Sequence, residues 1–204
     1  MLECECIRNN YQNSCTYILY EECSPNAWLI DCGDADQILD WVNRNGKRIC
    51  GVFLTHCHLD HIYGVNRVTE QYPYVIIYLS RGAGPIGIRD LRLNLSKYTA
   101  DPYVVETLNL QEIEEGDIIR IFDDSVLQVL RTDGHSPDSM SYRVGSLLFT
   151  GDAYIPGVRV VTKLPGADKK KAQENLNRIL TIIDNEALTV KPGHFITSKT
   201  INNV

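Results

Sequence analysis

The 204-residue sequence has no apolar run long enough to cross a membrane. Its longest run of aliphatic and aromatic residues is the short segment Tyr74–Leu79. The first residues, MLECECIRNN, have neither the basic start nor the apolar stretch of a secretory signal. We therefore expect a soluble, cytoplasmic protein with no membrane partner.

The sequence has fewer basic than acidic residues: it contains 20 Lys and Arg and 26 Asp and Glu, which gives a formal net charge of −6. Proteins that bind nucleic acid usually carry a basic face that neutralises phosphates. We therefore expect no nucleic-acid partner. The sequence also lacks internal repeats, low-complexity tracts and linkers, so we expect one domain over residues 1–204 and leave its oligomeric state open.

Cysteine is absent after position 57, and all seven cysteines precede that point. An odd number without an export signal favours free thiols in a reducing compartment over a disulfide framework. We interpret Cys4 and Cys6 as small apolar strand residues, because no CxxC or Cys/His pair accompanies them to complete a zinc site. Cys57 is different, because it lies between two histidines.

Hydrophobic periodicity predicts strands in two batches, together with several helices. The first batch of predicted strands is Cys4–Arg8, Cys15–Tyr20, Ala27–Asp31, Ile49–Leu54 and Val75–Leu79. The second batch is Asp117–Phe122, Val126–Arg131, Ser141–Val144, Leu147–Thr150 and Leu188–Val190. Helices are predicted over Ala35–Asn43, Asp60–Gln71 and Asp168–Asp184, and a long loop with a short helical piece over Ser80–Pro102. This order indicates an α/β fold in which two sheets pack together with helices outside.

The five histidines of the chain all fall in short motifs, and three of them share one. His56, His58 and His61 lie with Asp60 in THCHLDH, directly after a buried strand. Imidazole and carboxylate groups are good ligands for zinc, manganese or iron. Residues two apart on an extended segment point the same way, so His56 and His58 can bind one ion together. Asp60 and His61, where a helix begins, can face a neighbouring ion.

The other two histidines and a second aspartate each follow the end of a predicted strand. His135 lies in DGHS, Asp152 in TGD and His194 in PGH. A sheet can aim side chains at its strand ends into one shared cleft. Scattered core or surface histidines are the alternative interpretation, but five of five in motifs, with two aspartates, favour a metal site.

The series THCHLDH, GHS, TGD and PGH, in this order, resembles the metallo-β-lactamase superfamily over almost the whole chain. The resemblance implies the four-layer αβ/βα sandwich of that family and two divalent ions, with zinc preferred and iron or manganese as alternatives. It implies ligands to the first ion from His56, His58 and His135, ligands to the second from Asp60, His61 and His194, and a bridge between them from Asp152. Asp31, in LIDCG, resembles the family's aspartate that orients a metal ligand by hydrogen bonding.

The same resemblance implies a hydrolase in which a metal-bridged hydroxide attacks a small-molecule substrate and Asp60 also accepts a proton. The segment Leu91–Ser96 and the helix before PGH resemble short glyoxalase II-like thioesterases, so we expect a thioester or other small ester-like substrate. Asp138 and Phe195 depart from that pattern, because they stand where glycines are common. The basic pair Arg159 and Lys163 suits recognition of an anionic substrate as well as it suits an ordinary surface.

Two other functions share these motifs. A persulfide dioxygenase resembles the same pattern but uses one iron, held by the equivalents of His56, His135 and Asp152. A phosphodiesterase or nuclease is the third alternative. The glycines of Gly82–Gly87 formally match a dinucleotide-binding fingerprint, but Pro85 interrupts it, so we interpret them as a flexible loop and expect no organic cofactor.

Overall fold

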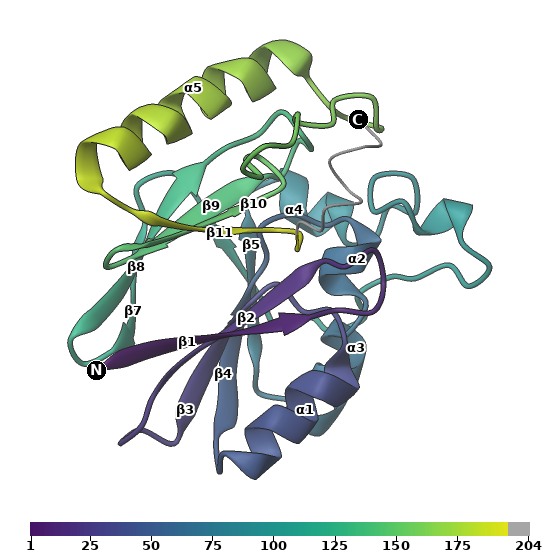
Figure 1. The fold of residues 1–204 in the computed structure, drawn as a ribbon. Helices are drawn as coiled ribbons and strands as arrows, with labels where there is room; N and C mark the ends of the chain where they lie inside the picture. Colours follow the sequence, from purple (N-terminus) through teal and green to yellow (C-terminus); the bar gives the residue numbers. More distant parts are fainter. Residues whose placement is uncertain (196–204) are drawn as a thin grey trace.

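The structure, a computed structural model, describes residues 1–195, and within them two mixed sheets pack face to face (Figure 1). The first sheet has the order β1-β2-β3-β4-β5-β6, with antiparallel pairs up to β3 and parallel pairs beyond it. Its strands are β1 (Leu2–Arg8), β2 (Cys15–Glu21), β3 (Asn26–Ile30), β4 (Arg48–Phe53), β5 (Ile76–Ser80) and β6 (Leu110–Ile113).

The second sheet has the order β11-β10-β9-β8-β7 and is antiparallel except for the parallel pair β10–β11. Its strands are β7 (Ile118–Phe122), β8 (Ser125–Arg131), β9 (Met140–Val144), β10 (Leu147–Gly151) and β11 (Thr189–Pro192). The crossover from β10 to β11 passes through the long helix α5 (Lys169–Glu186), which lies over the second sheet (Figure 1).

Helices cover the outer face of the first sheet as well, which gives the four layers predicted from the sequence (Figure 1). These helices are α1 (Ala35–Arg44), α2 (Leu59–Ile62), α3 (Val65–Gln71) and α4 (Ala83–Gly87), and a 3₁₀ turn, η1 (Ser96–Tyr98), follows them. Successive side chains along β4 point to opposite faces of the first sheet. Val52 packs in the cluster that contains Ile38 of α1, between the sheet and its helices. Phe53 packs between the two sheets, where it contacts Tyr142. The αβ/βα sandwich is therefore confirmed.

The helix predicted over Asp60–Gln71 is wrong as a single element, because the chain turns between α2 and α3. At the turn, the Gly64 N–H donates to the Cys32 carbonyl at 2.9 Å, instead of continuing the helical ladder. This bond draws the segment against the end of β3. A Cβ at Gly64 would lie 2.0 Å from the Gly33 carbonyl oxygen, so only glycine permits the approach.

Replacing Gly64 with alanine is expected to lower the free energy of unfolding by about 2–3 kcal/mol, because the new methyl group overlaps backbone that cannot move freely. Gly46→Ala is the matched control, since Gly46 has φ of +61° and open space around it. That variant isolates backbone strain, which costs about 1 kcal/mol. Urea unfolding of both variants measures the difference, and equal losses would contradict a steric role for Gly64.

Other sequence predictions need smaller corrections. β6 was missed, and Gly84 and Gly87 belong to the packed helix α4 instead of a flexible loop, whereas Gly82 precedes that helix. A Cβ at Gly84 would lie 2.5 Å from Leu79 Cδ1, so Gly84 permits close packing of α4 on β5. Cys4 and Cys6 do pack against the inter-sheet core as small apolar strand residues, and all seven cysteines are free. Among residues 1–195, no helix is long and apolar enough to span a bilayer.

Candidate metal centre

The ends of four strands carry the histidine motifs to one edge of the sandwich. THCHLDH follows β4, His135 follows β8, Asp152 follows β10 and His194 follows β11. Strands from both sheets therefore contribute to the same place, as the sequence predicted. All seven side chains proposed as ligands meet there in three overlapping groups.

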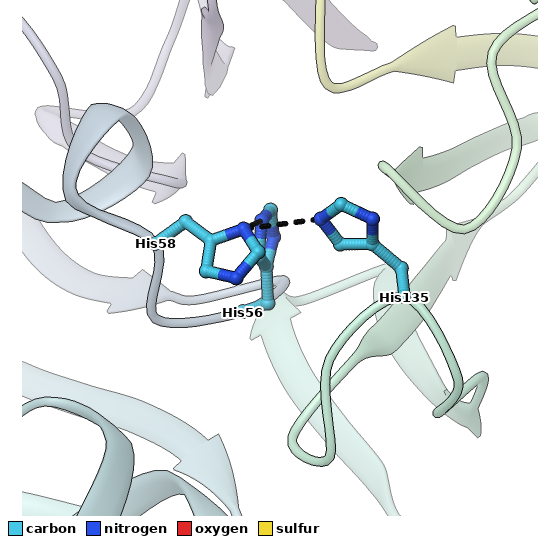
Figure 2. A group of neighbouring side chains, drawn as sticks. All are labelled: His56, His58 and His135. Carbon is cyan, nitrogen blue, oxygen red and sulfur yellow. Dashed lines mark hydrogen bonds between the residues drawn. The ribbon is translucent and has the colours of Figure 1, made fainter. Parts of the chain in front are cut away.

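The first group contains three buried imidazoles whose nitrogens converge (Figure 2). His58 Nδ1 lies 3.1 Å from His56 Nε2 and 3.0 Å from His135 Nε2. His135 Nδ1 donates to the Val161 carbonyl at 2.9 Å, and a carbonyl only accepts. With the Nδ1 proton held in this bond, His135 can present the lone pair of Nε2 to the centre of the group, as a metal ligand must.

The second group combines a carboxylate with two imidazoles. Asp60 Oδ2 lies 3.5 Å from His61 Nε2 and 3.3 Å from His194 Nε2, and the two imidazole nitrogens are 3.4 Å apart. His194 Nδ1 donates to the Gln12 carbonyl at 3.1 Å, which directs its Nε2 into the group. The two groups thus lie side by side, each with three converging ligand atoms.

Asp152 lies between the two groups. Its Oδ2 is 3.2 Å from His194 Nε2 and 3.6 Å from His135 Nε2, and its Oδ1 is 3.5 Å from His61 Nε2. Oδ1 is buried without a hydrogen-bond partner among the described residues. A buried carboxylate oxygen is costly to leave without a partner, and a cation would supply one. This donor set therefore fits a pair of divalent cations.

The electrostatics of the two groups differ. Burial lowers the pKa of His58 to about 3, and the neighbouring His135 adds to the effect. Burial also lowers the pKa of His56, so His56 and His58 are neutral imidazoles. Burial opposes charge on His61 and His194 too, but carboxylates outweigh it: Asp60, Asp31 and Asp152 at His61, and Asp152 and Asp60 at His194. They raise the pKa of His61 to about 9 and that of His194 to about 11. A cation entering the second group therefore displaces protons.

Asp31 supports the centre from outside. Its Oδ2 accepts from His61 Nδ1 at 2.8 Å and from the Thr55 hydroxyl at 2.8 Å, and its Oδ1 accepts from Thr55 N at 2.7 Å. Its φ of +61° lies in the left-handed region, which Asp tolerates better than most residues. Burial raises the pKa of the Asp31 carboxyl, and His61 with the Thr55 bonds opposes that shift. The predicted orientation of a metal ligand by Asp31 agrees with this geometry.

Some functional contacts had no signal in the sequence. The Val161 and Gln12 carbonyls, which hold His135 and His194, are backbone atoms that any residue carries. Thr55 could have been noticed, because it opens THCHLDH and bonds both Asp31 and His56. Cys57 stays apart from the ligand groups, since its thiol packs against the Gly84 carbonyl at 3.7 Å.

The structure separates the basic pair Arg159 and Lys163 and buries Asp138. Arg159 lines a small pocket together with His135 and Asp152, and it also lines a neighbouring groove along α5. Lys163 lines neither of these two pockets. Asp138 is buried and accepts from the Ser136 hydroxyl at 2.7 Å.

Distant relatives of this chain among curated proteins include several hydroxyacylglutathione hydrolases. The chain is 28% identical to a hydroxyacylglutathione hydrolase of Pseudoalteromonas translucida over 64% of its own length and 42% of the relative. It is 26% identical to the enzyme of that name from Buchnera aphidicola subsp. Schizaphis graminum over 74% of its length and 50% of the relative. The chain thus spans about half the length of the curated relatives it matches.

Solved structures of similar fold match nearly the whole chain. The di-iron-bound form of TTHA1623 has a TM-score of 0.79 at 26% identity, covering 97% of this chain and 96% of that one. BLEG-1, a B3 metallo-beta-lactamase, has a TM-score of 0.78 at 26% identity, over 95% and 92% of the two chains. ETHE1 from Myxococcus xanthus has a TM-score of 0.74 at 26% identity, over 96% and 77%.

The family comparison covers the same motifs. The family model described as the metallo-beta-lactamase superfamily matches residues 12–194, which contain every strand from β2 to β11 and all seven converging side chains. Because this match agrees with the four layers and the clustered histidines, the chain belongs to the metallo-β-lactamase superfamily.

Proposed function

We propose that this protein is a metal-dependent hydrolase that binds two divalent cations, zinc preferred, and cleaves a thioester or similar small ester. The observation that carries the proposal is the pair of three-ligand groups that share Asp152. We assign His56, His58 and His135 to one cation, Asp60, His61 and His194 to the other, and Asp152 to both.

Bound cations of this kind lower the pKa of a water molecule and polarise the carbonyl that it attacks. The protein's own residues hold and orient the reacting groups. The Asp60 side chain is buried except for 14% of its surface. Burial alone would raise the pKa of its carboxyl, but His61 and His194 outweigh burial, so the pKa lies below its ordinary value. Asp60 thus stays ionised at the edge of the centre, where it accepts a proton from the attacking water.

The thioester substrate is supported by the curated relatives, which are named hydroxyacylglutathione hydrolases. The pocket beside His135 and Asp152 adds a local argument, because Arg159 brings a positive charge to it. Among the described residues, Arg159 forms no ion pair, so its guanidinium is free to meet an anionic group of the substrate.

Replacing Arg159 with alanine is expected to raise KM for a carboxylate-bearing thioester roughly tenfold with little change in kcat, because the lost contact binds ground and transition states alike. Lys163→Ala is the matched control, since it removes a nearby positive charge that does not line the pocket. Steady-state kinetics of both variants, on thioesters with and without a carboxylate, measures whether the effect depends on the substrate's charge. Equal effects on both substrates would contradict anion recognition by Arg159.

The decisive experiment is metal quantification on protein purified without chelator, combined with a panel of thioester, lactone and phosphodiester substrates. Two zinc ions per chain with thioester turnover are expected. One iron per chain with thiol-dependent oxygen uptake would overturn the proposal in favour of a persulfide dioxygenase. Phosphodiester turnover without thioester turnover would overturn the substrate class and leave the two-metal centre standing.

A further inference from the structure

The turn between β1 and β2 carries two consecutive residues in the left-handed region. Gln12 and Asn13 both have φ of 56°, where a side chain's Cβ crowds the backbone. Residues other than glycine keep such a conformation only where their surroundings fix it, and they cluster at functional sites. The contacts around this turn therefore indicate its role.

The turn holds the end of β11 through two backbone carbonyls. The Gln12 carbonyl accepts from His194 Nδ1 at 3.1 Å, and the Asn13 carbonyl accepts from Phe195 N at 3.0 Å. The first bond fixes the ring of His194, whose Nε2 faces Asp60. Any shift of the Gln12 carbonyl would therefore turn the imidazole within the second ligand group.

The base of the turn is fixed by buried groups. Asn9 is almost fully buried, and its backbone N–H donates to the Ser14 carbonyl at 2.9 Å. Its side-chain nitrogen donates to Ser14 Oγ at 3.0 Å, and its side-chain oxygen accepts from Asp34 N at 2.9 Å. These bonds close the turn, but none of them reaches Gln12 or Asn13 at its tip.

At the tip, Ser14 N donates to the Tyr11 carbonyl at 3.3 Å across Gln12 and Asn13, and an exposed arginine outside the ligand set adds side-chain contacts. Arg8 donates from Nε at 3.2 Å and from Nη2 at 2.6 Å to the side-chain oxygen of Asn13. The same guanidinium lies 5.5 Å from the ring centroid of Phe195, within the range of a cation–π contact. Arg8 thus joins the turn to the residue that follows His194. The Phe195 side chain, 48% exposed, forms the other wall of this clamp.

We propose that Arg8 is a positioning residue, which fixes His194 through Asn13 and the Gln12 carbonyl, with Phe195 completing the clamp. Arg8 itself touches none of the seven converging side chains. Its predicted effect on ion affinity rests on the proposed two-cation function, whereas its effect on the His194 ring does not. Two measurements therefore test it.

The first measurement is a cobalt(II) titration of the full chain followed by its visible spectrum. Arg8→Ala is expected to weaken binding of one of two cobalt equivalents roughly tenfold, the lower end of what outer contacts of metal ligands contribute. The other equivalent should change by less than about twofold. Arg8→Lys keeps the charge near Phe195 but loses the paired donors, so it should fall between Arg8→Ala and wild type. Arg44→Ala, which removes an exposed arginine paired with Asp40 on α1, is the matched control.

The second measurement needs no metal. In wild-type protein and Arg44→Ala, the hydrogen-bonded Nδ1 proton of His194 should give a resolved downfield NMR resonance, assigned by its loss in His194→Ala. In Arg8→Ala this resonance should broaden through faster exchange with water. An unchanged resonance in Arg8→Ala would overturn the clamp, even if wild-type protein binds two cobalt ions. A broadened resonance in a protein that binds fewer than two ions would support the clamp and refute the two-cation function.

Discussion

Asp152→Asn is expected to lower kcat/KM for thioester hydrolysis by on the order of 10³-fold or more and to reduce the metal content below two ions per chain. The reason is the position of Asp152 between both ligand groups, with one oxygen near His61 and the other near His194 and His135. Asparagine keeps the shape but replaces one oxygen with an N–H donor and removes the charge. Elemental analysis and steady-state kinetics on the same preparation measure both effects.

The control for that prediction is Asp40→Asn, which neutralises an exposed carboxylate on α1 that pairs with Arg44. It should keep wild-type metal content and rate. Circular dichroism and thermal unfolding of both variants separate loss of the centre from loss of the fold. If Asp152→Asn retained two ions and lost less than about tenfold in kcat/KM, Asp152 would not be a shared ligand.

The convergence of the seven side chains could be predicted from the sequence because each lies close to the end of a strand. A strand's end fixes where its next few residues point, and strands that share an edge bring those residues together. THCHLDH needs no distant information to place His56 and His58 on one side of an extended segment. His135, Asp152 and His194 follow β8, β10 and β11 in the same manner. The grouping of these side chains was therefore predictable before any contact between the two sheets was known.

The parts that were missed depend on contacts between distant segments. The break at Gly64 arises from the Cys32 carbonyl, which lies 32 positions earlier and which no helical periodicity reveals. β6 has two exposed glutamine and glutamate residues in four, and it becomes a strand only because β5 offers it a parallel partner. Leu180 lies in α5 directly after the buried Ile179 and at helical spacing from the apolar Leu176 and Ile183, yet 36% of it is exposed. Periodicity gives a helix a face but does not say how much of that face its sheet covers.

Asp31→Ala is expected to weaken metal affinity roughly 10- to 100-fold, because His61 loses the acceptor that orients its ring. The same change should lower the free energy of unfolding by about 4 kcal/mol, since buried donors of Thr55 and His61 lose their partner. Alanine also tolerates the φ of +61° poorly, which costs about 1 kcal/mol of that total. Competition with a chromogenic chelator measures affinity, and urea unfolding of the metal-free protein measures stability.

Asp31→Asn separates the two effects at one position. Asparagine tolerates the left-handed conformation and keeps one oxygen to accept from Thr55 N, so most of the stability should return. Its amide, however, has a single oxygen for both sides of the site. If that oxygen accepts from Thr55 N, the N–H₂ group faces the Nδ1–H of His61, and if it accepts from His61, Thr55 N has no acceptor. Metal affinity should therefore stay roughly tenfold or more below wild type while stability recovers. Wild-type affinity in Asp31→Asn would mean that the carboxylate serves the fold alone, because orientation of His61 would then need no negative charge.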